Sequence, residues 1–414
     1  MGQWQDDMVV RRDNPGIDAF GHLRVSNSEA LVSVLGQYDT EPLEMESGAT
    51  GTGVAPAHNT TTRMTRLSVD AGSGTSFMQS YVYWTYQPGR SQRVELTGRL
   101  STPIAGAVTD FGYFDADNGI FYRQNDGLGV EFVIRSKTSG VVVNRVVPQA
   151  SWNLDKMDGT GPSGLILDTT KVFILTMDFE FLGMGRVRMG FNIDGTIIYA
   201  HQFLHSNLDE VPYMQTATLP IQMLLTGTAT PATSEAFFKG ALVISEGGLL
   251  KERGFTFATP ERTITAANGA RTHILSVRPK LLFNGITNRE SYVTRTLELC
   301  LTQANGNPVF WELVAGANFS PNPTWTDINT QFSGTEVSTD GVFLNLTGGV
   351  VLKSGYVSAG NQGQNVVSTH LDLHHPLTLN RAGAHTSIGT LSLLVTGIGG
   401  TAATRASLNF TELR

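Results

Sequence analysis

The stretch from Phe111 to His205 constrains the fold most, because every segment in it predicts the same kind of element. Short apolar or alternating runs are separated by turns rich in Gly, Asn and Asp, as in strands joined by tight reversals. Asp194-Gly195 lies between two runs at the two-residue spacing of a type I′ hairpin. The expected strands are Phe111–Phe114, Ile120–Gln124, Val130–Ser136, Val141–Val147, Val172–Phe181, Arg186–Ile193 and Thr196–Phe203. The stretch therefore predicts an antiparallel sheet.

Alternation within Arg186–Ile193 predicts which side of this sheet is packed, because successive side chains of a strand point to opposite faces. One face carries Val187, Met189, Phe191 and Ile193, and the other carries Arg186, Arg188 and Asn192. We expect the polar face to meet water. The apolar face needs a cover, and helical periodicity is almost absent nearby. The expected cover is a second sheet, which makes the expected fold a sandwich.

Composition places the whole chain in the all-β class. Its 414 residues include 45 Gly and only 16% are charged, which suits many short strands joined by Gly-containing turns. The formal net charge of −7 argues against nonspecific nucleic-acid binding. No run approaches the roughly 18 uninterrupted apolar residues of a membrane span, and the start lacks the pattern of a cleaved leader. Cys300 is the only cysteine, which excludes an intramolecular disulfide and a multi-cysteine zinc site. We expect no cofactor, no membrane contact and no specific nucleic-acid partner.

Turn-rich and small-residue stretches divide the chain into four parts. Residues 1–60 predict an N-terminal extended arm and linker, which would be ordered only against a partner. Residues 61–248 predict a first antiparallel β-sandwich, and the polar residues 249–271 predict a linker. Residues 272–414 predict a second antiparallel sandwich of the jelly-roll or lectin-like kind. Within it, Val293–Leu301 alternates, with its leucines on one face.

The arm carries the motif Asp18-Ala-Phe-Gly-His-Leu-Arg-Val-Ser26. Through this motif the chain resembles a group of virion structural proteins of tailed bacteriophages, in which Arg usually stands where this chain has His22. The resemblance covers roughly residues 15–250 and continues in Phe114–Phe121, Val147–Asn153, Gly161–Leu165 and Gly183–Phe191. At the level of fold, a sheet with one polar, solvent-facing side and an Asp-Gly hairpin is also similar to concanavalin-like lectin and laminin-G-like sandwiches.

The resemblance implies a non-enzymatic structural protein of the virion, on the capsid surface as a cement or decoration protein, or in the tail or baseplate. Its expected partners are other virion proteins and further copies of the chain, and we predict a homotrimer. The predicted partner-binding residues of the arm are Phe20, Leu23, Arg24 and Val25, because their segment is too short to bury the apolar ones locally. Two alternatives remain open: a receptor- or carbohydrate-binding tail fibre or spike that contacts a host surface glycan, and a glycan-degrading enzyme.

Asp178 and Glu180 are the one pair of carboxylates whose spacing could suit glycoside hydrolysis. Two residues apart on one face of a strand, their Cα atoms would be about 6.5–7 Å apart. Laminarinase-like sandwiches have a similar Glu-x-Asp-x-x-Glu strand, but here Thr176 stands at the first position and no Glu closes the motif. The pattern favours a solvated sheet face. We therefore predict no catalytic residue, and only slight effects on stability from Asp178→Asn and Glu180→Gln.

The remaining candidates do not complete a site. The histidine groups are His201 with His205, and His370 with His374 and His375. In a strand, residues four apart are about 13 Å apart, which is too far for one metal ion. Asp115–Gly119 begins like a calcium loop but lacks the later Glu, so it predicts a turn, with calcium as the alternative. Cys300 has no His near it in sequence and is predicted to be inert. The nucleophile elbow, the phosphate-binding loop and the zinc-protease motif are all absent.

Overall fold

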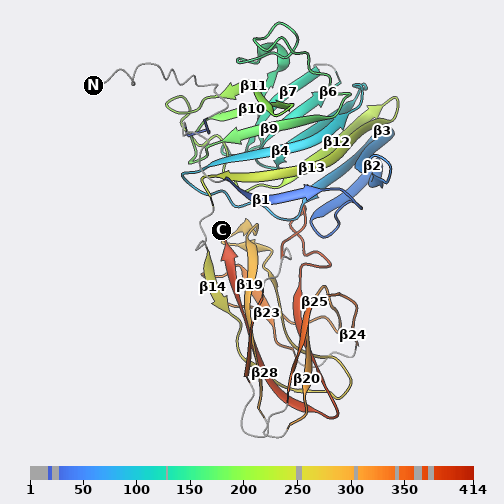
Figure 1. The fold of residues 1–414 in the computed structure, drawn as a ribbon, viewed down its shortest axis with the longest axis vertical. Coiled ribbons are helices and arrows are strands. Elements are labelled where there is room, and N and C mark those ends of the chain that lie inside the picture. Colours follow the sequence, from blue (N-terminus) through green and yellow to red (C-terminus); the bar gives the residue numbers. More distant parts are fainter. Residues whose placement is uncertain are drawn as a thin grey trace, which may run out of the picture. The chain divides into compact units, whose positions relative to one another are not determined.

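The computed structural model describes residues 17–20, 28–126, 129–248, 254–302, 306–340, 345–358, 366–371 and 377–414. In these ranges the chain forms strands and one 3-10 helix, η1 (Gln149–Ser151), without any α-helix. The chain divides into two compact units, Met1–Lys251 and Glu252–Arg414 (Figure 1). The predicted all-β class is confirmed. Within the described ranges, no helix has the length and apolar character needed to cross a membrane.

One sheet of 13 strands, antiparallel throughout, builds the first unit. Its order is β11-β10-β9-β4-β13-β3-β12-β5-β6-β7-β8, with β1 beside β13 and β2 beside β3. The strands are β1 (Ser28–Leu35), β2 (Met45–Asn59), β3 (Met64–Ser80), β4 (Ser91–Leu100), β5 (Ala107–Phe114), β6 (Gly119–Asn125), β7 (Gly129–Ser136), β8 (Val143–Pro148), β9 (Phe173–Phe179), β10 (Val187–Ile193), β11 (Thr196–Phe203), β12 (Ile221–Thr230) and β13 (Ser234–Glu246).

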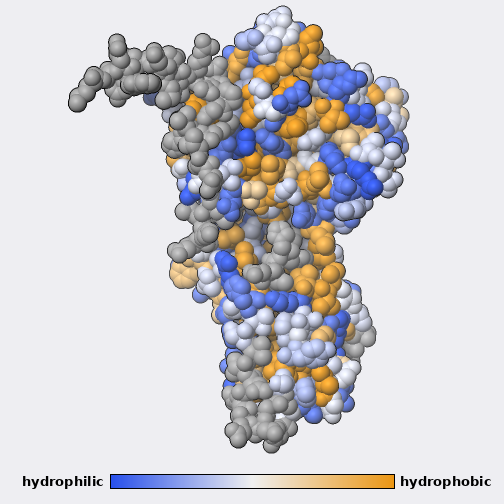
Figure 2. Space-filling model, viewed as in Figure 1, coloured by the Kyte–Doolittle hydropathy of each residue, from blue (hydrophilic) through white to orange (hydrophobic). Residues whose placement is uncertain are grey.

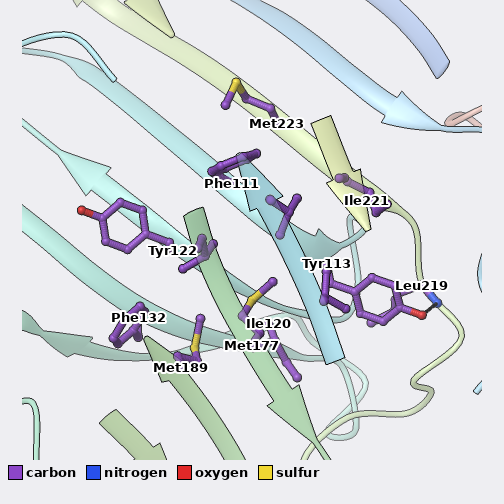
Figure 3. Packing of buried hydrophobic residues seen from close by; sticks show 14 of the residues in the cluster. Phe111, Tyr113, Ile120, Tyr122, Phe132, Met177, Met189, Leu219, Ile221 and Met223 are labelled. Carbon is purple, nitrogen blue, oxygen red and sulfur yellow. Dashed lines mark hydrogen bonds between the residues drawn. The ribbon is translucent and has the colours of Figure 1, made fainter. Parts of the chain in front are cut away.

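This sheet folds over, so that its two ends enclose one apolar core. The Phe191 ring of β10 lies 5.6 Å from the Tyr122 ring of β6 and 6.2 Å from the Phe132 ring of β7, measured between centroids. In hydrogen-bonding order β9, β4, β13, β3, β12 and β5 all lie between β10 and β6. Figure 3 shows Met177, Met189 and the rings of β5 to β7 packed together in this core. The first unit is therefore a sandwich made from one curled sheet.

Local sequence signals explain the hairpins of this unit. Asp194 and Gly195 have φ angles of 49° and 84°, as a type I′ turn requires, and they join β10 to β11. On β10 the predicted core residues Val187, Met189 and Phe191 are fully buried. The predicted hairpin turn and the predicted core face of this strand are both confirmed.

The structure places residues 28–59 in the sheet of the first unit, where the sequence predicted an arm over residues 1–60. β1 pairs with β13 from Ser28 opposite Glu246 to Leu35 opposite Gly240. β2 pairs with β3 from Met45 opposite Ser80 to Asn59 opposite Met64. Both partners are interior strands of the sheet, since β13 lies between β4 and β3, and β3 lies between β13 and β12. A truncation at residue 60 would therefore remove two strands of this unit.

Two sheets packed face to face form the second unit. The first has the order β14-β28-β19-β26 with β15 beside β28, and the second has the order β22-β23-β16-β27-β20-β25. Leu297 and Leu299 of the first sheet share a core with Trp311 and Leu393 of the second. The strands are β14 (Phe255–Ala258), β15 (Arg262–Ala266), β16 (Thr272–Pro279), β19 (Ser291–Leu301), β20 (Val309–Ala315), β22 (Thr326–Asp327), β23 (Thr335–Ser338), β25 (Val350–Val357), β26 (Val366–His370), β27 (Leu391–Gly397) and β28 (Ala402–Leu413), with two small ribbons, β17 (Leu282–Phe283) with β18 (Ile286–Thr287) and β21 (Asn318–Ser320) with β24 (Asn345–Thr347).

The predicted linker over residues 249–271 contains two of these strands. β14 and β15 both pair with β28, which places them in the second unit. The division between the units falls at Lys251 and Glu252. Both strands are largely or partly exposed, and the polar residues just before β14 lie outside the described residues.

Candidate functional site

The outer face of β9 and β10 holds a fully buried ion pair between Asp178 and Arg188. The two residues stand opposite each other in the register of the strands, and the side chains of both are 0% exposed. Arg188 Nε donates to Asp178 Oδ1 at 2.8 Å, and Arg188 Nη2 donates to Oδ2. Tyr199 of β11 donates its hydroxyl to the same Oδ2 at 2.7 Å, and its ring centroid lies 4.2 Å from the guanidinium carbon. Asp178 thus accepts three hydrogen bonds in a planar fork geometry.

A short N-terminal segment, Ile17–Phe20, crosses this face, and we call it the strap. The contacts that hold it are Arg188 Nη2 to the Ile17 carbonyl (2.6 Å), Arg186 Nη2 to the Asp18 carbonyl (2.9 Å) and the Ala19 N–H to Ser91 Oγ (3.3 Å). The first three strap residues are each less than 5% exposed. The strap therefore closes the face over the ion pair.

The predicted solvated face at Asp178 and Arg188 is therefore wrong. The alternation predicted correctly which residues lie on the polar face. That face, however, contacts the strap and neighbouring side chains instead of water. Thr176, two residues before Asp178 on the same face, is also fully buried. A polar face can be covered in this way because each guanidinium hydrogen bond satisfies a carbonyl of the strap.

Glu180 lies beside this pair but has a different environment. Its Oε1 accepts the backbone N–H of Arg186 at 3.0 Å. Burial raises the pKa of the Glu180 carboxyl, and the charges of Asp18 and Asp178 raise it further. Asp178 and Glu180 are close enough for their charges to interact. Both oxygens of Asp178, however, already accept hydrogen bonds from Arg188 and Tyr199. A carboxylate in that state is a structural acceptor, since an acid or nucleophile must reach its substrate.

Of the histidines predicted not to form a metal site, His201 and His205 pack against aromatic rings. His201 is buried and its Nδ1 accepts the N–H of Asn153 at 3.2 Å; burial lowers its pKa to about 4. The Nδ1 atom of His205 hydrogen-bonds the Gly185 carbonyl at 2.8 Å, and the imidazole ring stacks on the Tyr213 ring. His370 lies at the end of β26, and His374 and His375 lie outside the described residues. No three or more Cys, His, Asp or Glu side chains are grouped to hold a metal ion in the part of the chain that the structure describes.

The loop Asp115–Gly119 is a turn closed by its own acidic residue. Asp115 Oδ1 accepts the backbone N–H groups of Asp117 and Asn118, both at 2.8 Å. Asp117 pairs with Lys137 at 2.9 Å. This is the geometry of an Asx turn, in which the carboxylate satisfies local backbone donors. Cys300 is partly buried, and its Sγ contacts the Leu301 carbonyl at 3.4 Å.

Of the predicted partner-binding residues, only Phe20 can be placed, and it is partly buried in the strap. Leu23, Arg24 and Val25 lie outside the described residues. The strap residues before Phe20 contact the chain's own sheet, which is a contact that the sequence did not predict. Sequence reasoning also missed the roles of Ser91 and Tyr199. The only available signal was an acid and a base at matching positions of two neighbouring predicted strands.

The strap contacts bring together two stretches that carry the bacteriophage resemblance. Asp18–Ser26 begins inside the strap, and Gly183–Phe191 contains both arginines that hold it. A third stretch, Val147–Asn153, packs into the core through Trp152. Its Trp152 stacks on Phe132 at 4.3 Å between centroids and donates its indole N–H to the Val147 carbonyl. The residues that carry the resemblance thus include core and strap contacts.

No family model and no curated protein matches the chain. Among solved structures, a glycosyl hydrolase family protein from Mycobacterium fortuitum is similar with a TM-score of 0.35 and 11% identity, over 52% of this chain and 99% of that one. A Bacillus licheniformis beta-glucanase gives 0.31 and 12%, over 53% and 98% of the two chains. A legume lectin-like domain from Entamoeba histolytica gives 0.30 and 9%, over 51% and 95%. Similarities at this level carry no activity to this chain.

Proposed function

We propose that this chain is a non-enzymatic structural protein of a bacteriophage particle, which assembles with copies of itself on the capsid surface or in the tail. The observation that carries the proposal is the contact between two of the stretches on which the resemblance rests. Arg186 and Arg188 hold the strap by its backbone carbonyls, so these residues serve packing. The same contact closes the face around Asp178, the one place where a catalytic pair was conceivable.

Glycan binding is the second candidate, and the surface of the first unit supports it less well. Sugar sites use exposed aromatic rings as stacking platforms. Among the described residues of this unit, the large hydrophobics that are exposed are aliphatic, apart from Tyr38 at 79%. On the side drawn in Figure 2, hydrophobic residues lie scattered among hydrophilic ones across this unit.

Purified protein at micromolar concentration is expected to be a homo-oligomer. Multi-angle light scattering should give a multiple of the 44.7 kDa chain mass. Cryo-electron microscopy of particles should then place both sandwiches in density at stoichiometric occupancy. A chain absent from purified particles would contradict the proposal.

The same preparation is expected to release no reducing sugar from polysaccharide of the host surface. Asp178 cannot reach a substrate while Arg188 and Tyr199 occupy its oxygens. Glu180→Gln serves as the comparison, because it removes the second carboxylate of the pair. Sugar release by the wild type that is lost in Glu180→Gln would establish the enzyme instead.

A further inference from the structure

The edge strand β11 of the first sheet is covered by a short segment of the chain itself, residues 153–155, which we call the edge cover. Among the described strands β11 pairs only with β10, and it ends the hydrogen-bonding order of the sheet. The backbone N–H groups of Leu154 and Asp155 both donate to the Ala200 carbonyl, at 3.1 and 3.0 Å. The Asn153 side chain donates to the Gln202 carbonyl and accepts the Gln202 N–H, each at 2.9 Å. The edge cover thus occupies groups that an open edge strand offers to another strand.

A histidine of β11 completes the attachment of the edge cover. The Asn153 N–H donates to Nδ1 of His201 at 3.2 Å. In a neutral imidazole one ring nitrogen carries a proton and the other accepts, so the proton of neutral His201 is on Nε2. A second proton would go to Nδ1. It would turn this acceptor into a donor that faces the Asn153 N–H, so the bond exists only while His201 is neutral.

The other buried histidine of this region has the opposite hydrogen-bond polarity. Nδ1 of His205 lies 2.8 Å from the Gly185 carbonyl. A carbonyl oxygen only accepts, so this nitrogen carries the proton and donates it. Protonation of His205 adds a hydrogen to Nε2 and leaves the bond to Gly185 in place. Protonation therefore breaks the hydrogen bond of His201 and keeps that of His205.

The surroundings of His201 keep it neutral while the edge cover is closed. His201 is 7% exposed. Burial, and then the positive charge of Arg145 on β8, lower its pKa to about 4. Arg145 lies 3.9 Å from the carboxylate of Asp209, and β10 directs its charged residues to the strap face, since Met189 stands opposite His201. The other titratable side chains on the segments around His201 are Asp155, Lys156, His205 and Glu210.

Both ends of the edge cover are fixed, which confines an opening to the cover itself. On one side, the Trp152 ring stacks on Phe132 in the core, at 4.3 Å between centroids. On the other side, the Asp155 carboxylate accepts the backbone N–H groups of Met157 and Ser163, at 2.8 and 2.7 Å. The cover can therefore leave β11 while the core and the following loop stay folded.

We propose that the edge cover is an acid-operated device, in which protonation of His201 expels the Asn153 N–H and releases residues 153–155 from β11. The Ala200 carbonyl and the backbone groups of Gln202 then become open, as in an edge strand without a cover. This device does not depend on the proposed role in a phage particle.

The direction of the effect follows from proton binding in the two states. In the released state His201 meets water and binds its proton with the ordinary pKa of 6.5, whereas in the closed state its pKa is about 4. The released state therefore holds more protons between these values. The edge cover loses stability as pH falls from 6.5 to about 4.

Hydrogen exchange of the full-length wild-type protein, measured by mass spectrometry at pH 7 and pH 4.5, tests the proposal. The protection factor is the intrinsic exchange rate at each pH divided by the measured rate. It should fall about 50-fold at pH 4.5 for the amides of Leu154, Asp155 and Gln202. The amides of β12, in the middle of the sheet, should keep their protection. Unchanged protection of the edge cover overturns the proposal, and so does an equal loss in β12, because the unit would then open as a whole.

His201→Asn distinguishes this histidine from the other groups that titrate in this range. The asparagine Oδ1 takes the place of Nδ1 as an acceptor and cannot be protonated, so the edge cover should be equally protected at both pH values. His205→Asn is the matched control and should show the wild-type fall. A fall that persists in His201→Asn overturns the role of His201. Should His201→Asn not fold, the wild-type measurement still decides the proposal.

Discussion

Arg188→Ala is expected to lower the unfolding free energy of the first unit by about 3–5 kcal/mol, which is the cost of removing one partner from a buried ion pair. Asp178 would lose both guanidinium hydrogen bonds at a fully buried position, while the Tyr199 hydroxyl would still donate to it. The strap would also lose its hydrogen bond to the Ile17 carbonyl. Hydrogen exchange of the β9 and β10 amides, measured by mass spectrometry, reports the opening free energy of this region.

Lys137→Ala is the matched control for this prediction. Lys137 and Asp117 also form an ion pair, at 2.9 Å, but their side chains are 38% and 43% exposed. Its loss should cost no more than about 1 kcal/mol. Arg188→Lys is a second comparison, because lysine keeps the charge and loses the fork that spans both the carboxylate and the strap. Equal protection of β9 in wild type and Arg188→Ala would show that the ion pair contributes nothing.

Earlier exposure of the strap should accompany the loss of stability. In Arg188→Ala, limited proteolysis should cut within the strap, residues 17–20, faster than in the wild type, because the strap has lost one of its anchors. The expectation from sequence, that Asp178→Asn changes stability only slightly, is revised for the same reason. An amide at that position cannot balance the buried guanidinium charge.

The parts of the fold that sequence predicted are those governed by near neighbours. The Asp194-Gly195 turn selects its hairpin through the φ angles it allows, and the leucines of β19 alternate because one face is buried. β1 was missed because its partner is distant: Ser28 pairs with Glu246. β2 pairs with the next strand, β3, and was missed for a different reason. The glycines of β2 resembled a flexible linker. In the structure, a side chain at Gly53 would collide with the Thr75 carbonyl, so glycine is needed for close approach of the strands.

In the candidate site, too, local features could be predicted from the sequence and long-range contacts could not. The period of a strand predicted that Arg188 lies on the polar face of its strand and that Asp178 shares a face with Glu180. It did not predict that Asp178 and Arg188 stand opposite each other. Whether such a face meets water or another part of the chain depends on the strap, whose contacts are made through backbone carbonyls. Backbone carbonyls are the same at every residue and leave no pattern in a sequence. The strap could therefore be found only from the structure.

Glu290→Gln is expected to change how the stability of the second unit depends on pH. Glu290 is 9% exposed, and Arg414 Nε lies 2.6 Å from its Oε1. Arg414 also bonds Glu412, which is fully buried and accepts the Ser333 hydroxyl at 2.6 Å. One guanidinium thus serves two buried carboxylates. Burial, and then the charge of Glu412, raise the pKa of Glu290 to about 7.

The sign of the effect follows from proton binding in the two states. Between pH 4.5 and 7 the folded second unit holds a proton on Glu290 that the unfolded chain has released. Folding is therefore favoured by this group at low pH, and its contribution is lost as pH rises to about 7. A shift from 4.5 to about 7 corresponds to about 3 kcal/mol. Glutamine cannot titrate, so the variant lacks this loss.

The measurement is the difference in unfolding free energy between wild type and Glu290→Gln at pH 4.5, 6 and 8. Relative to the wild type, the variant should gain about 3 kcal/mol across this range. His273 and His385, whose pKa values burial lowers to about 4, are present in both proteins and cancel in the difference. Hydrogen exchange of the first unit serves as an internal control, because the substitution lies in the second. A difference that stays constant with pH would mean that Glu290 is ionised in the folded state throughout, with Arg414 balancing both carboxylates.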